Sequence, residues 1–263
     1  MSLQHPKNHF KQAMQQGQTQ LGAFLALADG YTCEVMASSS FDWLLIDAEH
    51  GPNDLRSVLA QLQAMAGYDT SPVVRPADHS VSMIKRLLDI GVQSLLIPMV
   101  ESGDEAKQLV DAIRYPNGGA AGGGIRGVGA GMARAARWYG VDNYMANAEQ
   151  ELCLVLQIES LAGLDAIEQI AAVDGVDALF LGPADLAAAM GHLGNPGHPA
   201  VQQAVEDALK RIQVTGKAAG VFCGDPDIAK QYRALGASFM LIGADSIFLR
   251  NAAEAQVDRF KEQ

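Results

Sequence analysis

Two carboxylates, Glu159 and Asp185, each follow a short apolar run of the chain and could hold a metal ion together. The two runs are Leu152–Ile158 and Ala178–Gly182. If these runs are neighbouring parallel strands, their ends lie roughly 4.8 Å apart, so both side chains can reach one cation. Carboxylates without a nearby lysine suit a hard, oxygen-preferring ion such as Mg²⁺ or Mn²⁺. We therefore predict a divalent-metal site, the alternative for Asp185 being a solvated acid at a helix start.

The segment Pro183–Ala184–Asp185 is typical of the first turn of a helix. The free backbone amides of such a turn bind anions. We expect the amides of Ala184 and Asp185 to bind the carboxylate of a 2-oxo acid. The keto and carboxylate oxygens of the same acid would chelate the metal.

Arg75 and His50 follow two further apolar runs, Pro72–Arg75 and Trp43–Asp47. An unpaired charge at the end of a buried strand is costly, so Arg75 either forms a structural ion pair or meets a charge on the substrate. We favour the second role, in which a permanent cation stabilises an enolate oxygen. His50 has Asp47 three residues before it, and we expect Asp47 to orient the ring for proton transfer. The alternative is a structural histidine.

The lysines argue against covalent imine chemistry. A Schiff-base aldolase needs a lysine that projects into its active site. None of the eight lysines follows an apolar run, and Lys217 precedes one. The sequence therefore favours metal chemistry over a Schiff base.

The elements that must position these residues alternate along the chain. Short, nearly continuous apolar runs are typical of parallel strands buried on both faces, and apolar residues at helical spacing lie between most of them. The predicted strands are Leu21–Leu27, Trp43–Asp47, Pro72–Arg75, Ser94–Met99, Leu152–Ile158, Ala178–Gly182, Ala218–Cys223 and Ser238–Gly243. The predicted helices are Leu55–Met65, Ser80–Leu88, Glu105–Ile113, Leu164–Ala172, Val201–Val214 and Asp227–Leu235.

Eight such strands in about 250 residues predict a single (β/α)8 TIM barrel over residues 1–263, with a doubly wound open sheet as the alternative. In such a barrel, the residues that follow the strands share one face. Residues 1–19 form an N-terminal extension or helix, and residues 246–263 form an extra C-terminal helix. The Gly118–Gly124 segment lacks the lysine and Ser/Thr of a phosphate-binding loop, so we interpret it as a flexible surface loop.

The composition excludes several classes of protein. Of the 263 residues 49% are hydrophobic, enough for a sizeable core, and the net charge is −11 with a pI of about 4.9. No basic stripe for nucleic acid is visible. Three cysteines are too few for a disulfide framework. No apolar stretch suits a membrane span or a signal peptide, so we expect a cytoplasmic protein with small-molecule substrates.

Several separated segments, taken in order, are similar to the HpcH/HpaI aldolases. The similarity runs from about residue 20 to residue 255, and the segments that carry it are Phe41–Asn53, Pro72–Pro76, Leu96–Val100, Gly124–Gly129, Val155–Glu159 and Gly182–Leu186. The connection after Tyr115–Pro116 is usually short in the family, whereas Asn117 to Gly123 add small residues here. We expect this departure to affect the choice of aldehyde.

The resemblance implies a reaction and a cofactor. Family members of the type that acts on 4-hydroxy-2-oxoheptanedioate cleave it to pyruvate and succinate semialdehyde. Glu159 and Asp185 would then ligate Mg²⁺, Mn²⁺ or Co²⁺. Arg75 would bind the keto oxygen of pyruvate and stabilise its enolate.

The resemblance also implies supporting residues and an assembly. His50, paired with Asp47, would handle protons, Gln157 would sit beside the metal ligands, and Asp89 would support the site from behind. Family members form hexamers as trimers of dimers with exchanged C-terminal helices. The Ser246–Phe260 segment would then pack on the paired subunit.

Three alternatives remain open at this point. A 2-dehydro-3-deoxyglucarate-type sugar-acid aldolase would use the same metal chemistry. A coenzyme A-dependent lyase would need basic residues for the nucleotide phosphates, and this acidic chain offers few. A non-catalytic barrel that binds a 2-oxo acid would show no metal-dependent exchange of the methyl protons of pyruvate.

Overall fold

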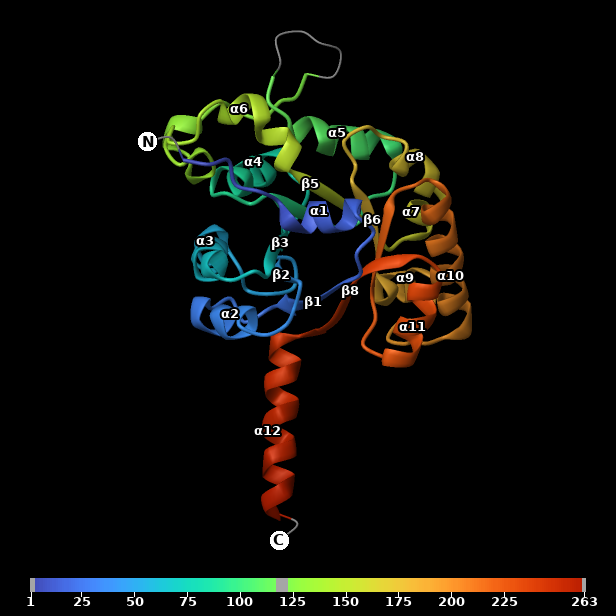
Figure 1. Cartoon of the computed structure of the whole chain (residues 1–263). Helices are drawn as coiled ribbons and strands as arrows, with labels where there is room; N and C mark the ends of the chain where they lie inside the picture. Colours follow the sequence, from blue (N-terminus) through green and yellow to red (C-terminus); the bar gives the residue numbers. More distant parts are fainter. Residues whose placement is uncertain (1–2, 117–122, 262–263) are drawn as a thin grey trace.

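Eight parallel strands close into a barrel in chain order, which confirms the predicted (β/α)8 fold (Figure 1). The computed structural model describes residues 3–116 and 123–261. The strands are β1 (Gln20–Leu25), β2 (Trp43–Asp47), β3 (Ser71–Arg75), β4 (Ser94–Ile97), β5 (Cys153–Ile158), β6 (Ala178–Leu181), β7 (Ala218–Phe222) and β8 (Ala237–Ala244). All eight predicted strands are therefore present, with ends that differ by at most two residues. The doubly wound alternative is excluded because β8 pairs with β1.

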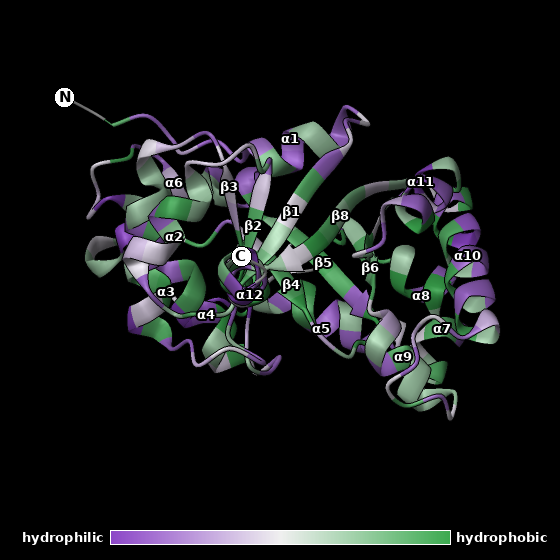
Figure 2. Cartoon of the chain, turned by 90° about the horizontal axis from the view of Figure 1, so that it is seen from below, coloured by the Kyte–Doolittle hydropathy of each residue, from purple (hydrophilic) through white to green (hydrophobic). Residues whose placement is uncertain are grey.

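Most of the helices surround the barrel and bury one face against it, whereas the first closes one end and the last extends away from the other (Figure 1). The helices are α1 (His9–Gln15), α2 (Gly30–Ala37), α3 (Leu55–Ala64), α4 (Val81–Asp89), α5 (Gly103–Ile113), α6 (Tyr144–Asn147), α7 (Leu161–Asp165), α8 (Ile167–Ala171), α9 (Pro183–Ala189), α10 (Pro199–Val214), α11 (Pro226–Ala234) and α12 (Asp245–Lys261). Short 3-10 turns η1 (Met65–Gly67), η2 (Ala130–Met132), η3 (Arg134–Ala136) and η4 (Ala148–Glu151) join some of them. Figure 2 shows hydrophobic colour along several strands, whereas the helices carry both hydrophobic and hydrophilic colour.

Two helices differ from the sequence prediction. The pattern missed α2, because its large apolar side chains Tyr31 and Val35 are exposed while its buried residues, Cys33 and Ala37, are small. The predicted helix Leu164–Ala172 is instead the α7–α8 pair, which is interrupted at Ala166.

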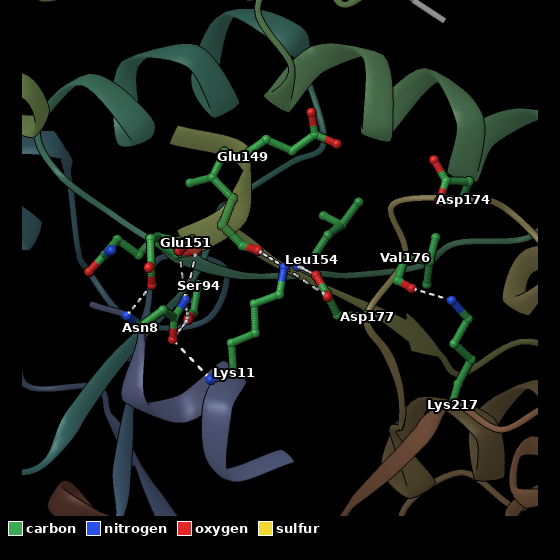
Figure 3. A network of polar contacts seen from close by, with 12 residues as sticks. Asn8, Lys11, Ser94, Glu149, Glu151, Leu154, Asp174, Val176, Asp177 and Lys217 are labelled. Atoms are coloured by element: carbon green, nitrogen blue, oxygen red, sulfur yellow. Dashed lines mark hydrogen bonds and ion pairs between the residues drawn. The ribbon is translucent and has the colours of Figure 1, made fainter. Parts of the chain in front are cut away.

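The N-terminal end of the barrel is closed by α1. Phe10 is fully buried against Trp43 and Phe239 in the barrel interior. Around it, the side chain of Asn8 donates to Ser94 Oγ at 2.9 Å, and Lys11 forms an ion pair at 3.1 Å with Asp177. Figure 3 shows how these groups converge from α1 and the starts of the strands. The predicted N-terminal helix thus acts as a plug.

The C-terminal helix α12 begins at the opposite end of the barrel and extends away from it (Figure 1). Asp245 anchors its first turn, because its carboxylate accepts the amides of Ala26 at 2.9 Å and Leu27 at 3.2 Å. Beyond this turn the helix is exposed along its length, including Leu249 and Phe260.

Part of the long connection between α5 and β5 packs as a small satellite core of its own, which includes Ala136, Val141 and Tyr144. The predicted flexible loop Gly118–Gly124 lies mostly outside the described residues. Within residues 3–116 and 123–261, no helix has both the length and the apolar character that crossing a membrane requires.

Candidate active site

Arg75 lies at the centre of a buried charge cluster at the C-terminal ends of β2 and β3. Residues Asp47 and Arg75 are register partners in the two strands. The guanidinium donates to both carboxylate oxygens of Asp47, from Nε at 2.9 Å and from Nη2 at 2.7 Å. Its Nη1 forms an ion pair at 3.1 Å with Glu49, and the ring of Phe24 lies 5.0 Å from the guanidinium carbon. The arginine is thus fixed in orientation from three sides.

This environment keeps Arg75 cationic. Burial alone would lower its pKa, but the hydrogen bonds and charge of Asp47, together with the charges of Glu49 and Glu159, outweigh burial and raise the pKa. An arginine held this way is a permanent charge that can face a developing oxyanion.

The Asp47 carboxylate does not contact the ring of His50, with which the sequence predicts it to pair. The Asp47 carboxylate is occupied by Arg75, and it contacts His50 only through the backbone amide, at 3.4 Å. The imidazole is largely exposed, and its Nε2 lies 3.8 Å from Glu49 Oε2. The local reason is that Asp47 Oδ1 also accepts the amide of Glu49 at 3.1 Å, so the carboxylate caps its own turn.

Glu159 is buried directly after β5. Its Oε1 accepts the amide of Met99 at 3.0 Å, and its Oε2 is in close contact with the amide nitrogen of Gln157. Met99 has a left-handed backbone with φ of 54°, which is uncommon for a residue with a side chain. Such conformations persist where the surrounding structure enforces them. Here the turn aims an N–H group at the carboxylate.

The helix α9 starts at Pro183, as the sequence predicts, and places Asp185 in its first turn. Ala184 and Asp185 are both exposed at this end of the barrel. Gly182, the residue before this helix, packs directly against Glu159. There is no space for a side chain here, since a Cβ at Gly182 would contact the Glu159 carboxylate and lie 2.9 Å from the Gln157 amide nitrogen. The structure therefore brings the two predicted metal ligands to one location.

The electrostatics of this location suit a cation. Burial raises the pKa of Glu159 to about 7, and the charges of Asp185 and Glu49 add to this shift against the opposing amides of Met99 and Gln157. Burial also raises the pKa of Glu49, although Arg75 and His50 oppose the shift. The carboxylates at this location thus repel one another, and Arg75 offsets only part of their negative charge.

The donor set also fits a divalent ion. Gln157 Oε1 is buried and has no hydrogen-bond partner among the residues that the structure describes, which leaves an oxygen free beside Glu159. Among the described residues, no three His, Cys, Asp or Glu side chains are grouped closely enough to hold a metal. The chain would supply Glu159 and Asp185, and water or substrate would supply the other ligands, as is usual for Mg²⁺.

Asp89 lies away from this cluster. It is the last residue of α4, five residues before β4 begins, and so lies at the N-terminal end of the barrel. Its carboxylate accepts from Arg126 Nη2 at 3.2 Å. Within one chain Asp89 therefore does not contact the site that it is expected to support, because the length of strand β4 separates the two ends of the barrel.

Sequence reasoning gave no role to Glu49, Phe24 and Met99. Glu49 stands in the same turn as His50, but only the fold shows that it faces Arg75. Phe24 alternates with buried residues in β1, a pattern that does not distinguish a core residue from a site residue. The contribution of Met99 is its backbone amide, which no residue pattern reports.

Comparisons with known proteins agree with this geometry. The family model for HpcH/HpaI aldolase/citrate lyase matches residues 20–252. A hydroxypyruvate/pyruvate aldolase from Pseudomonas aeruginosa is 51% identical over 256 residues, covering 97% of this chain and 94% of the relative. A 4-hydroxy-2-oxo-heptane-1,7-dioate aldolase from Escherichia coli is 47% identical over 257 residues, covering 98% and 96%.

The solved structures agree as well. The crystal structure of an HpcH/HpaI aldolase/citrate lyase family protein from Burkholderia cenocepacia matches with a TM-score of 0.92 at 38% identity, covering 97% of this chain and 100% of that one. These relatives are named aldolases, and the class of the protein is that of carbon–carbon lyases. The chain belongs to the HpcH/HpaI aldolase/citrate lyase family, which confirms the resemblance found in the sequence.

Proposed function

We propose that the protein is a divalent-metal-dependent aldolase that cleaves a 4-hydroxy-2-oxo acid to pyruvate and an aldehyde. The observation that carries this proposal is the convergence of Glu159 and Asp185 beside a fixed, cationic Arg75. Glu159 and Asp185 would hold Mg²⁺, Mn²⁺ or Co²⁺, with Gln157 beside them. When bound, the cation supplies Lewis-acid polarisation of the keto group of the substrate.

The side chains of the protein divide the remaining work. The start of α9, at Ala184 and Asp185, would bind the substrate carboxylate. His50 would accept the proton of the C4 hydroxyl, directly or through a water molecule. As the C3–C4 bond breaks, its electron pair forms the enolate of pyruvate, and Arg75 stabilises the negative oxygen. Protonation at C3 then gives pyruvate.

The lysine positions support a metal-dependent rather than an imine mechanism. Lys217 donates to the carbonyl of Val176 at 2.6 Å at the start of the strands. Lys11 lies at the same end, where it donates to the carbonyl of Leu152. The other lysines are on the N-terminal segment or the outer helices. None of the eight, all of which are described, projects from the end of a strand where Arg75 lies.

The test is a substrate panel with and without metal. Purified protein is treated with EDTA, then supplied with Mg²⁺, Mn²⁺ or Co²⁺ and assayed for pyruvate release from 4-hydroxy-2-oxoheptanedioate and from sugar-derived 4-hydroxy-2-oxo acids. We expect cleavage only with metal. Cleavage that survives EDTA, or release from none of these acids, would contradict the proposal.

The identity of the donor acid has a second candidate. Three relatives that are 49 to 52% identical are named hydroxypyruvate/pyruvate aldolases, above the 47% of the heptanedioate enzyme. We therefore propose that hydroxypyruvate also serves as the donor in the synthetic direction. Parallel reactions of pyruvate and hydroxypyruvate with succinate semialdehyde and shorter aldehydes compare the two directly. A preference for succinate semialdehyde would favour 4-hydroxy-2-oxoheptanedioate as the natural substrate.

We also propose that the protein assembles as a hexamer of paired subunits that exchange α12, and that it acts in the cytoplasm. Ile247, Leu249 and Phe260 are more than half exposed on a helix that leaves its own barrel, so apolar surface would be covered in such a pair. Light scattering on the full chain and on a Phe260→Lys variant tests the assembly. A monomeric wild-type chain would contradict it.

A further inference from the structure

The turn that carries Glu49 and His50 lies outside the strands and helices, and it is tied to β3 at its start, where the amide of Ala48 donates to the carbonyl of Arg75 at 2.9 Å. It spans residues 48–52, between the end of β2 and the start of α3. The turn passes close to the ends of β1 and β2. A Cβ at Gly51 would lie 2.6 Å from the carbonyl oxygen of Asp47, which ends β2, and 3.2 Å from the backbone of Ala26, which follows β1. Small movements of this turn would displace the imidazole and the carboxylate that faces Arg75.

One side chain, Asn53, bridges the base of this turn. Its Nδ2 donates to the carbonyl of Asp47 at 2.7 Å and to the carbonyl of Leu25 at 3.3 Å. These two carbonyls are at the ends of β2 and β1. The side-chain amide of Asn53 therefore links the ends of the two strands where the turn begins. It also connects the two ends of the turn, because Asp47 precedes the turn and Asn53 follows it.

Asn53 is itself held in a fixed orientation. Its Oδ1 accepts from Gln61 Nε2 at 2.6 Å and from Ser57 Oγ at 2.9 Å. Gln61 is buried in α3 and also donates to the carbonyl of Ser57 at 3.1 Å. Two donors meet the oxygen and two acceptors meet the nitrogen, so only a carboxamide in this orientation satisfies every partner.

We propose that Asn53 is a positioning residue that holds the 48–52 turn, and with it His50, in the geometry for proton transfer during cleavage. The inference rests on the proposed function and deepens it, because Asn53 acts through His50 and not on the substrate. Aspartate at this position would keep the acceptor for Gln61 and Ser57. It would, however, set a carboxylate oxygen against two carbonyl oxygens.

The experiment separates proton removal from enolate stabilisation. Cleavage of a 4-hydroxy-2-oxo acid needs a group to take the hydroxyl proton. Decarboxylation of oxaloacetate does not: the bond to the departing CO2 breaks and its electron pair forms the same pyruvate enolate beside Arg75. Asn53→Asp and Asn53→Ala are compared with Ser57→Ala, which removes one partner of Asn53 Oδ1 but leaves both bonds from Asn53 Nδ2 to the ends of β1 and β2.

We expect both Asn53 variants to lower kcat for cleavage by about 10- to 100-fold, since misplacement of a reacting group by about 1 Å has effects of this size. KM for cleavage and the rate of oxaloacetate decarboxylation should change by less than about threefold, because the groups that bind the acid remain in place. Hydrogen exchange of the amides in residues 48–52 should accelerate. Ser57→Ala should match the wild type in all of these except thermal stability.

Three results are decisive. Parallel loss of cleavage and decarboxylation in the Asn53 variants would show a general structural role and overturn the inference. Unchanged amide exchange in residues 48–52 would overturn it independently of any activity. A wild-type protein that cleaves no 4-hydroxy-2-oxo acid would overturn the proposed function, while the exchange measurement would still decide whether Asn53 holds the turn.

Discussion

Two buried glutamates stand at opposite ends of strand β5 and have opposite electrostatic environments. Glu151, just before the strand, accepts from Lys7 Nζ at 2.6 Å and from the amide of Asn8 at 2.8 Å. Although burial would raise its pKa, these partners lower it. Glu159, just after the strand, has burial and neighbouring carboxylates against it, and its pKa rises to about 7.

The contrast shows where the barrel is built for stability and where it is built for function. At the N-terminal end, α1 supplies partners for the charges of the strand starts (Figure 3). At the C-terminal end, no residue in the described part of the chain forms a hydrogen bond with Gln157 Oε1, and Glu159 faces other carboxylates. Strongly perturbed pKa values of this kind gather at functional sites. This matches the rule that active sites of such barrels lie at the carboxyl ends of the strands.

The largest effect should come from Glu159→Gln. We expect it to reduce cleavage by about a thousandfold or more, since it removes a metal ligand and with it the Lewis acid. Metal titration by calorimetry should show weaker binding of Mn²⁺. Without metal the variant should fold at least as stably as the wild type, and more stably at neutral pH, because the lost charge is one that burial penalises. Wild-type activity in this variant would break the comparison.

The next effect should come from Arg75→Lys. A lysine keeps the charge but cannot donate to both oxygens of Asp47 while facing Glu49. We expect cleavage and oxaloacetate decarboxylation to fall together, each by about 100-fold, because both form the same enolate. Steady-state kinetics on the two substrates measure this. Loss of cleavage alone would show that Arg75 serves the proton transfer rather than the enolate.

A smaller effect, and of another kind, should come from Glu151→Gln. The loss of charged hydrogen bonds should destabilise the fold by about 1–3 kcal/mol. For a chain of this size the melting temperature would fall by about 2–4 °C for each kcal/mol. Activity at 25 °C should stay within about twofold of the wild type. Calorimetry and kinetics on the same sample decide, and a large loss of activity with an unchanged melting temperature would reverse the assignment of the two ends.

The last effect should appear in the stability of the metal-free protein as a function of pH. Below the ordinary glutamate pKa of 4.5, Glu159 is neutral in both the folded and the unfolded states and has no effect on stability. As pH rises from 4.5 to about 7, the unfolded state loses its proton first, so the wild type should lose stability relative to Glu159→Gln. Above pH 7 the difference should be constant.

Melting curves of both proteins in EDTA from pH 4.5 to 8.5 measure this difference. The contribution of Glu151 has the opposite sign: it is present above the ordinary value of 4.5 and is lost as pH falls below it. A gap between wild type and Glu159→Gln that narrows as pH rises would contradict the raised pKa of Glu159.

The sequence predicted the frame of the site better than its contacts. Glu159, Asp185 and Arg75 were predicted from their places after apolar runs, and the fold brings them to one end of the barrel. The contacts of Asp47 were not predictable in this way. From the sequence, Asp47 could pair with the ring of His50, with nearby backbone amides or with a residue of another strand. In the structure its carboxylate accepts two hydrogen bonds from Arg75 across the strands, and it also accepts the amide of Glu49.

The alternation of apolar runs and amphipathic segments by itself determined the order of strands and helices, because a strand buried on both faces and a helix buried on one leave different patterns. The pairing of β8 with β1 then decided for the barrel over the open sheet. The alternation also determined which residues follow the strands, and hence the face that carries the chemistry. Only the tertiary structure decided that Asp89 lies at the far end, that Glu49 faces Arg75 and that burial raises the pKa of Glu159. These three features depend on distances between residues of different strands. Closure of the barrel sets those distances, and a local stretch of sequence does not contain them.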